Sequence, residues 1–238
     1  MKNKTYVLVH GAYHGGWCWR QVADLLRAHG HRVFTPTLTG LGERAHLLAL
    51  DPDLDTHIED IAQVIANEEL RDVILVGHSY GGAVVTGVVD RMPETIAHLV
   101  YLDALILQQG HAVLDTAPPE TRDFCRSLLR SNGGSGAIPI PPLDFFAVAD
   151  AAQCNWLTRH LTPQPVSTFF SKMHLQRELG AGRPVSYITC TDPYFPQAQF
   201  ARDFAKTMPH WNQLAIATGH DAMVTAPHEL ADLFNRIA

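Results

Sequence analysis

The sequence predicts an α/β protein: a mostly parallel, doubly wound sheet with a helical lid inserted between two strands. The main observation is alternation, because short apolar runs typical of buried strands are followed by segments with apolar residues at helical spacing. The second observation is one long interruption of this order, from about Leu105 to Arg183. Strands that alternate with helices pair in parallel and are covered on both faces. The 238 residues therefore predict one core that carries one large insertion.

Seven elements are expected before the insertion. The first helix has apolar positions at Val22, Leu25 and Leu26, and Gly30 follows its end. Pro36 ends the strand after it. In order, the elements are strand Thr5–Val9, helix Trp17–Ala28, strand His31–Thr35, helix Ile58–Ile65, strand Val73–Val76, helix Ala83–Val89 and strand Leu99–Leu102.

Four elements are expected after the insertion and complete the alternation. They are strand Val185–Cys190, helix Ala198–Ala205, strand Leu214–Ala217 and helix Glu229–Ile237. We therefore expect residues 1–104 and 184–238 to form the core. Residues 105–183 are expected to form the lid.

The insertion contains helix-like pieces near Pro119–Leu129 and Ala151–His160, a glycine-rich run at 132–136, and several prolines. Disordered segments are poor in aromatic residues, whereas the insertion contains several. They are Phe145, Phe146, Trp156, Phe169 and Phe170. An ordered insertion of this size between two strands predicts a lid over the strand ends, rather than a flexible surface loop.

Composition argues against several classes of function. Apolar residues make up 46% and charged residues 18%, with a formal net charge of −6, so no basic surface for nucleic acid is expected. The apolar run Tyr6–Val9 is too short for a signal peptide, and no stretch is long enough to span a membrane. We expect a cytoplasmic protein that acts on a small molecule.

No cofactor or metal is expected. The four cysteines are widely separated, and the fourteen histidines form no metal-binding motif, so we interpret the cysteines as buried thiols. Residues 40–45 fit a G-x-G-x-x-A dinucleotide motif. However, that motif belongs at the first strand–helix turn, and here it follows the second strand.

The chemistry is indicated by Gly77-His78-Ser79-Tyr80-Gly81, which directly follows the apolar run Val73–Val76. This is a G-x-S-x-G sequence between a strand and a helix, where a sharp turn presents the middle residue as a nucleophile. The flanking glycines are expected because strand and helix approach each other closely at this turn. The sequence therefore predicts Ser79 as a nucleophilic serine.

A serine hydroxyl needs a base, and the base needs an acid that holds its tautomer. His220 directly follows the last predicted strand and is the expected base. Two acids qualify, because Asp192 follows the strand Val185–Cys190 and Asp103 follows the strand Leu99–Leu102. We favour Asp192 and interpret Asp103 as a structural hydrogen-bond acceptor.

An oxyanion hole needs two backbone N–H groups that point to one position. The amide of Tyr80, directly after the nucleophile, is one candidate. The glycine-rich loop after the first strand should provide the other, for which we select Ala12. Tyr13 in that loop and Phe146 and Trp156 in the lid are candidate substrate-pocket residues.

The sequence of residues 10–19, H-G-A-Y-H-G-G-W-C-W, resembles the H-G-A-x-H-G-x-W-x-W signature of one branch of the α/β-hydrolase superfamily. That branch contains plant methyl-ester esterases, hydroxynitrile lyases and related bacterial carboxylesterases. Residues 76–82 resemble its nucleophile turn, 190–192 its acid loop and 219–223 its histidine loop. The resemblance implies the α/β-hydrolase fold, a triad of Ser79, Asp192 and His220, and an oxyanion hole at Ala12 and Tyr80.

The expected function is hydrolysis of a small to medium apolar carboxylic ester through a serine acyl-enzyme. The alternatives are a hydroxynitrile lyase with the same triad, and a ligand sensor that retains a slow triad. The resemblance favours hydrolysis, because lyases of this branch carry lysine after the catalytic histidine and threonine after the first-loop histidine. Those positions are Asp221 and Gly11 here. Asp221 would repel cyanide, unless it is a solvated loop residue.

Overall fold

The computed structural model describes residues 3–131 and 136–237, so most of the predicted glycine-rich run at 132–136 lies outside the described residues. Six parallel strands form one sheet in the order β2-β1-β3-β4-β7-β8. Their bounds are β1 Thr5–Val9, β2 Arg32–Phe34, β3 Val73–His78, β4 Ile96–Leu102, β7 Val185–Cys190 and β8 Asn212–Ile216. The predicted parallel sheet is confirmed.

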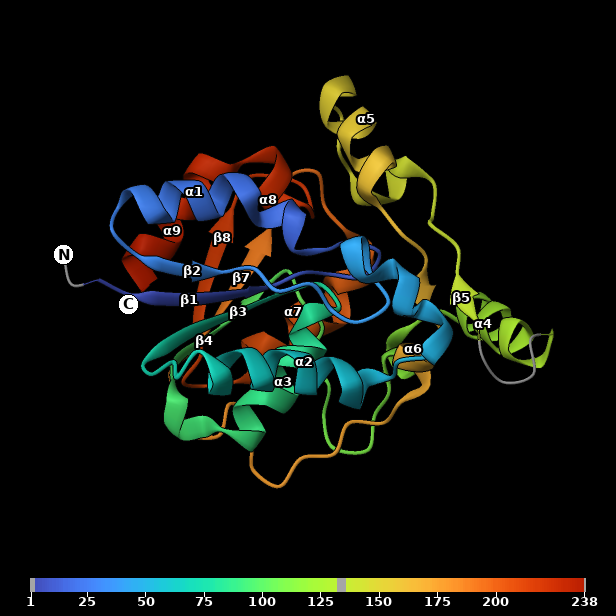
Figure 1. Cartoon of the computed structure of the whole chain (residues 1–238), viewed down its shortest axis with the longest axis horizontal. Helices are drawn as coiled ribbons and strands as arrows, with labels where there is room; N and C mark the ends of the chain where they lie inside the picture. Colours follow the sequence, from blue (N-terminus) through green and yellow to red (C-terminus); the bar gives the residue numbers. More distant parts are fainter. Residues whose placement is uncertain (1–2, 132–135, 238) are drawn as a thin grey trace.

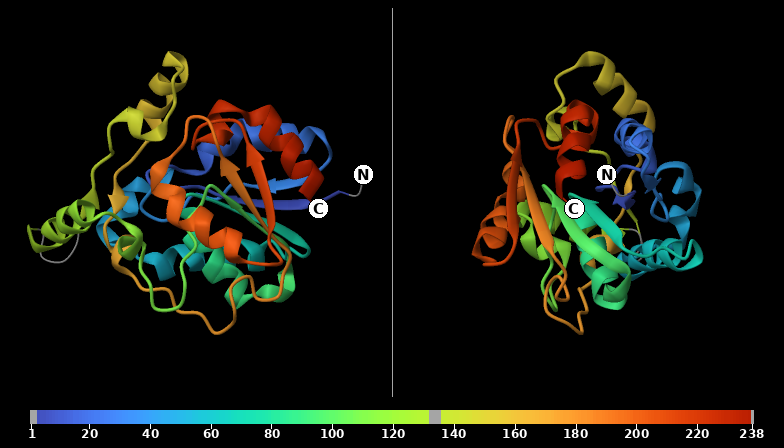
Figure 2. Two further views of the ribbon diagram at one scale, coloured as in Figure 1. Left: turned by 180° about the vertical axis from the view of Figure 1, so that it is seen from behind. Right: turned by 90° about the vertical axis from the view of Figure 1, so that its left-hand side faces the viewer.

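Helices cover both faces of this sheet, as the alternation predicts (Figures 1 and 2). One face carries α1 Arg20–Ala28, α8 Ala222–Thr225 and α9 Pro227–Ile237. The other face carries α2 Leu54–Asn67, α3 Gly81–Arg91 and α7 Gln199–Thr207. Short 3-10 helices cover Gly16–Trp19, Gly42–Leu50, Pro93–Thr95, Val113–Thr116, Leu143–Phe146 and Pro196–Ala198.

Side-chain alternation along the strands divides the core into two layers. In β1, Tyr6 and Leu8 pack under α1 and α9, whereas Val7 and Val9 pack against α2 and α3. All four side chains are buried, which is why this strand reads as a continuous apolar run. Helices cover both faces, so polar side chains can gather in the loops at the carboxyl ends of the strands.

The segment between β4 and β7 contains the remaining elements. They are α4 Pro119–Ser131, β5 Ala137–Ile138, α5 Ala151–His160, β6 Gln164–Pro165 and α6 Ser167–Phe170. Both predicted helical pieces are present, as α4 and α5. The two chain termini lie on the opposite side of the molecule from this segment (Figure 1).

The insertion contacts the first loop of the core directly. The side chain of Gln164 accepts a hydrogen bond from the backbone N–H of Tyr13 at 3.1 Å. The N–H of Thr162 donates to the carbonyl of Tyr13 at 2.9 Å. Tyr13 itself has a left-handed backbone, with φ of 68°. The conformation of the loop after β1 is therefore held from both sides by the insertion.

Candidate active site

The turn after β3 places Ser79 in a strained conformation, with φ of 51°. The flanking glycines are required by close packing. A Cβ at Gly77 would lie 2.6 Å from the carbonyl oxygen of Gly81, and a Cβ at Gly81 would lie 2.6 Å from that of His10. The local sequence therefore builds a tight strand–turn–helix unit with the serine at its apex.

The loop after β1 lies directly against this serine. A Cβ on Gly11 would approach both the Cβ of Ser79 and Nδ1 of His78 to 2.9 Å. The two amides selected as oxyanion donors, those of Ala12 and Tyr80, donate no hydrogen bond within the described parts of the chain. Ser79, Ala12 and Tyr80 all line one cavity, so both amides remain available to a bound group.

His220 pairs with Asp103. Nδ1 of the imidazole lies 2.8 Å from Oδ2 of the carboxylate, and both side chains are almost completely buried. The ring of Phe195 stacks on the imidazole with centroids 3.8 Å apart. Because a carboxylate only accepts, Nδ1 donates to it, and Nε2 has no hydrogen-bond partner among residues 3–131 and 136–237. His220 and Ser79 line the same cavity.

The prediction that Asp192 pairs with His220 is wrong. Asp192 is exposed, whereas Asp103 occupies the position beside the imidazole. The physical reason is the strand order. Asp103 follows β4, next to β7, and its own N–H donates to the carbonyl of Ile188 at 2.8 Å. The interpretation of Asp103 as only a structural hydrogen-bond acceptor is therefore also wrong, because Asp103 is the carboxylate that pairs with His220.

Arg202 is a functional candidate that the sequence analysis missed. From α7 it donates through Nε and Nη2 to the two carboxylate oxygens of Asp103, at 2.9 Å each, and through Nη2 to the carbonyl of Cys190 at 3.1 Å. Burial lowers the pKa of Arg202, but the Asp103 carboxylate outweighs this and raises it overall. A signal existed, because Arg202 takes an apolar-face position on α7, between the buried residues Ala201 and Ala205.

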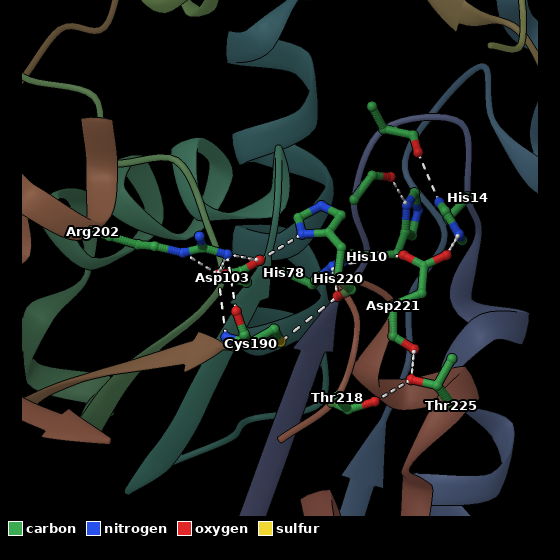
Figure 3. A network of polar contacts seen from close by, with 12 residues as sticks. His10, His14, His78, Asp103, Cys190, Arg202, Thr218, His220, Asp221 and Thr225 are labelled. Carbon is green, nitrogen blue, oxygen red and sulfur yellow. Dashed lines mark hydrogen bonds and ion pairs between the residues drawn. The ribbon is translucent and has the colours of Figure 1, made fainter. Parts of the chain in front are cut away.

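A second polar network lies beside the pair of His220 and Asp103 (Figure 3). His14 contacts the carbonyl of Ala12 through Nδ1 at 2.8 Å and Oδ2 of Asp221 through Nε2 at 3.2 Å. Nε2 of His78 lies 3.0 Å from the carbonyl of His220. Asp221 is completely buried, so its interpretation as a solvated loop residue is wrong.

His10 supports the same loop as a neutral ring. Its Nδ1 donates to the carbonyl of Gly11 at 2.8 Å, and its Nε2 accepts from the N–H of Leu38 at 3.1 Å. Burial lowers the pKa of His10 to about 3. Its role is to hold the loop after β1 in place.

The cavity at the site has a volume of 840 Å³ and mostly apolar walls. Its ionisable lining side chains are the groups already described, together with tyrosine, and no lysine, arginine or glutamate lines it in the described chain. Its mouth carries the exposed apolar side chains Phe124, Ile140 and Phe200. A larger groove of 1010 Å³ runs along α2, but its lining contains no serine, cysteine or histidine.

Two of the three predicted pocket residues line this cavity. Tyr13 and Phe146 do so, with their rings edge to face at 6.2 Å. Trp156 is not part of the lining. Its ring contacts those of Trp17 at 4.9 Å and His160 at 5.1 Å, because α5 packs against the 3-10 helix Gly16–Trp19. The prediction for Trp156 is therefore wrong.

The remaining predictions concern cysteines, metals and membranes. All four cysteines are unpaired, and three are buried, but Cys154 is only half-buried. Within residues 3–131 and 136–237, no group of three or more histidine, cysteine, aspartate or glutamate side chains is placed to hold a metal ion. The same residues contain no helix that is long and apolar enough to cross a membrane.

Comparisons with known proteins identify relatives over nearly the whole chain. The model of the alpha/beta hydrolase family matches residues 6–233. The chain is 43% identical to the carbendazim hydrolyzing esterase of Nocardioides sp. strain SG-4G, over 96% of this chain and 97% of that protein. It is 27% identical to methylesterase 10 of Arabidopsis thaliana, over 98% and 91% of the two chains.

Solved structures show the same fold. An extracellular alpha/beta-hydrolase from a Paenibacillus species superposes with a TM-score of 0.84 at 25% identity and covers 99% of both chains. Polyneuridine aldehyde esterase superposes with a TM-score of 0.79 at 20% identity, also over 99% of both chains.

Proposed function

The chain belongs to the alpha/beta hydrolase family, and we propose that it hydrolyses carboxylic esters through a covalent acyl-enzyme. In this proposal Ser79 is the nucleophile, His220 the base and Asp103 the acid. The observation that carries it is the buried 2.8 Å contact between His220 and Asp103, which leaves the imidazole Nε2 free in the cavity that Ser79 lines. The esterase names of the relatives support it.

The proposed reaction has two halves. Oγ of Ser79 bonds to the ester carbonyl carbon while its proton passes to Nε2 of His220. The amides of Ala12 and Tyr80 hold the oxyanion, and its collapse expels the alcohol, which takes the proton from His220. Water then gives a proton to His220 and attacks the acyl carbon. Ser79 leaves with that proton, and the carboxylic acid is released.

Asp103 acts in this scheme by fixing the tautomer of His220 and by stabilising the imidazolium that forms in each half. Arg202 holds both oxygens of Asp103, so the carboxylate is fixed before the substrate binds. It is therefore a positioning residue, because it acts on the imidazole only through Asp103.

The proposed substrate is a small alkyl ester of a neutral, largely apolar acid. The cavity walls are aromatic and aliphatic, including Phe145, Phe146 and Phe195. No lysine or arginine among the described lining residues is available to bind a second carboxylate on the substrate. The name of the relative methylesterase 10 supports an ester with a small alcohol.

The segment 105–183 is proposed as the lid of this site. It supplies much of the cavity wall, including Phe124, Ile138 and Phe146. It also fixes the loop after β1 through Gln164 and Thr162. Substrate selection is therefore assigned to this segment, and the chemical step to the core.

Two features support hydrolysis over cyanohydrin cleavage. Threonine at Gly11 would bring its Cβ to 2.9 Å from that of Ser79, so the loop would have to move. The position directly after His220 holds the buried Asp221, rather than the lysine that the lyases carry there. Negligible cyanide release from mandelonitrile is expected.

The test combines turnover with labelling. We expect many turnovers of a p-nitrophenyl ester, one phosphonate bound per chain at Ser79, and a loss of about 10⁴-fold or more in kcat for Ser79→Ala. A single stoichiometric burst without turnover would instead identify a ligand sensor. Labelling at another serine, with Ser79→Ala still active, would refute the proposal.

A further inference from the structure

The hydrogen bonds of His14 require one more proton than a neutral ring and a carboxylate hold. Nδ1 faces the carbonyl of Ala12, which can only accept, so Nδ1 must carry a hydrogen. Nε2 faces Oδ2 of Asp221 at 3.2 Å. In a neutral ring that nitrogen would present a lone pair to the carboxylate, which is repulsive. Either His14 or Asp221 therefore holds an additional proton.

The surroundings assign that proton to His14. Burial lowers the pKa of His14, but the Asp221 carboxylate outweighs it and raises the pKa overall. Burial raises the pKa of Asp221, but His14 outweighs it and lowers the pKa overall. The other ionisable groups around the pair are His10, Cys18, His78, Cys190 and His220. None of these offers Asp221 a hydrogen bond. Its Oδ1 has no hydrogen-bond partner in the described chain, and Nε2 of His78 lies 3.8 Å from it, beyond hydrogen-bond distance.

The pair joins the two loops that must act together. Ala12, whose carbonyl His14 holds, also carries one of the two amides proposed for the oxyanion hole. Asp221 directly follows His220, the proposed base. His78, which precedes the proposed nucleophile, adds a third link through the carbonyl of His220 at 3.0 Å. Loops from opposite ends of the chain thus meet at one buried charge pair.

We propose that His14 and Asp221 form a buried imidazolium–carboxylate pair that fixes the oxyanion loop against the histidine loop. This inference rests on the proposed function, because the loops matter together only if Ala12 and His220 act on one substrate. Both are positioning residues. They hold the distance between the oxyanion donor and the base and do not touch the reacting atoms.

The proposed charge pair predicts an imidazolium signal in the NMR spectrum of the unaltered protein, and variants serve only to assign that signal. In the ¹⁵N-histidine-labelled protein at pH 8.5, about two units above the ordinary histidine pKa, we expect one ring with both nitrogens protonated. The signal should be missing in His14→Gln and should change to that of a neutral ring in Asp221→Asn. A spectrum of the unaltered protein with no imidazolium at this pH would overturn the inference.

Kinetics test the positioning role. For Asp221→Asn we expect kcat on a p-nitrophenyl ester to fall by about 10- to 100-fold with KM changed by less than about twofold, because the lost alignment matters in the transition state. His14→Gln should lose a similar factor, and the double variant little more than either. The matched control is Asp192→Asn, an exposed aspartate in a neighbouring loop, which should retain full activity.

The outcomes separate this inference from the proposed function. Unchanged kcat in both folded single variants, or multiplied losses in the double variant, would refute the positioning role. If the substituted proteins fail to fold, the spectrum of the unaltered protein still decides the charge state. Absence of ester turnover in the unaltered protein would refute the proposed function but leave the imidazolium signal in place.

Discussion

Replacement of Asp103 by asparagine should have two separable effects. The carboxylate accepts from Nδ1 of His220 at 2.8 Å and from Nε and Nη2 of Arg202 at 2.9 Å each. An amide at that position favours the wrong tautomer of the imidazole, and we expect kcat/KM to fall by about 10⁴-fold, or about 5 kcal/mol. It also leaves the guanidinium of Arg202, which is 2% exposed, without a counter-ion.

The second effect is a loss of stability, which would lower the measured activity independently of the tautomer of His220. An orphaned buried charge costs about 3–5 kcal/mol, which for a protein of this size lowers Tm by about 6–20 °C. The double variant Asp103→Asn/Arg202→Met removes the orphaned charge, so Tm should recover by most of that amount. Activity should not recover, because the carboxylate that holds the tautomer of His220 is still missing.

The assay pairs p-nitrophenyl ester hydrolysis with thermal unfolding followed by circular dichroism. Asp192→Asn is the matched control, with activity unchanged and stability within about 0.5 kcal/mol. The reasoning is refuted if Asp103→Asn keeps activity within tenfold, or if Asp192→Asn loses as much. Recovered activity in the double variant would show that Asp103 acts only through stability.

Three further predictions concern pH, the cavity wall and the first loop. Burial lowers the pKa of His10 to about 3 and of His57 to about 4, below the ordinary 6.5, so stability should fall as pH decreases below 6.5. Each ring should lower the free energy of unfolding by up to about 1.4 kcal/mol per pH unit, as measured by denaturant titration. The slope of this free energy against pH should be smaller in His57→Gln, by the amount expected for one proton. Phe146→Ala should change the ranking of a panel of esters, whereas Trp156→Ala should not, because only Phe146 lines the cavity. Gly11→Thr should lower kcat by at least about tenfold without creating cyanide release, because the added Cβ presses on Ser79.

One result would contradict each of these three predictions. An unchanged slope in His57→Gln would mean that this ring does not stay neutral in the fold. Equal effects of the Phe146 and Trp156 variants on ester ranking would contradict the cavity assignment. Full hydrolytic activity in Gly11→Thr would show that the loop can move away from Ser79 at little cost.

Local sequence was sufficient for the fold class and for the strand–turn–helix unit at Ser79. Buried parallel strands read as apolar runs, and a turn with a left-handed residue between close-packed backbones requires glycine at Gly77 and Gly81. Both depend only on residues near each other in the chain. The same holds for the placement of His220, which follows the last strand directly.

The pairing partners were decided by tertiary structure. Sequence left two aspartates for His220, and only the neighbour order of β4 and β7, with Arg202 reaching from α7, put Asp103 beside the imidazole. Likewise, Trp156 lies in the predicted lid, but the orientation of α5 turns it to Trp17.

The sequence by itself determined which residue types stand at the strand ends, because strand periodicity and turn geometry are local properties of the chain. Only the tertiary structure decided which of those residues share a proton. The pair of His14 and Asp221 joins positions 207 residues apart, at a distance of 3.2 Å. Such a contact depends on the strand order and on the direction in which each loop leaves the sheet. Neither property is determined by the sequence next to His14 or Asp221.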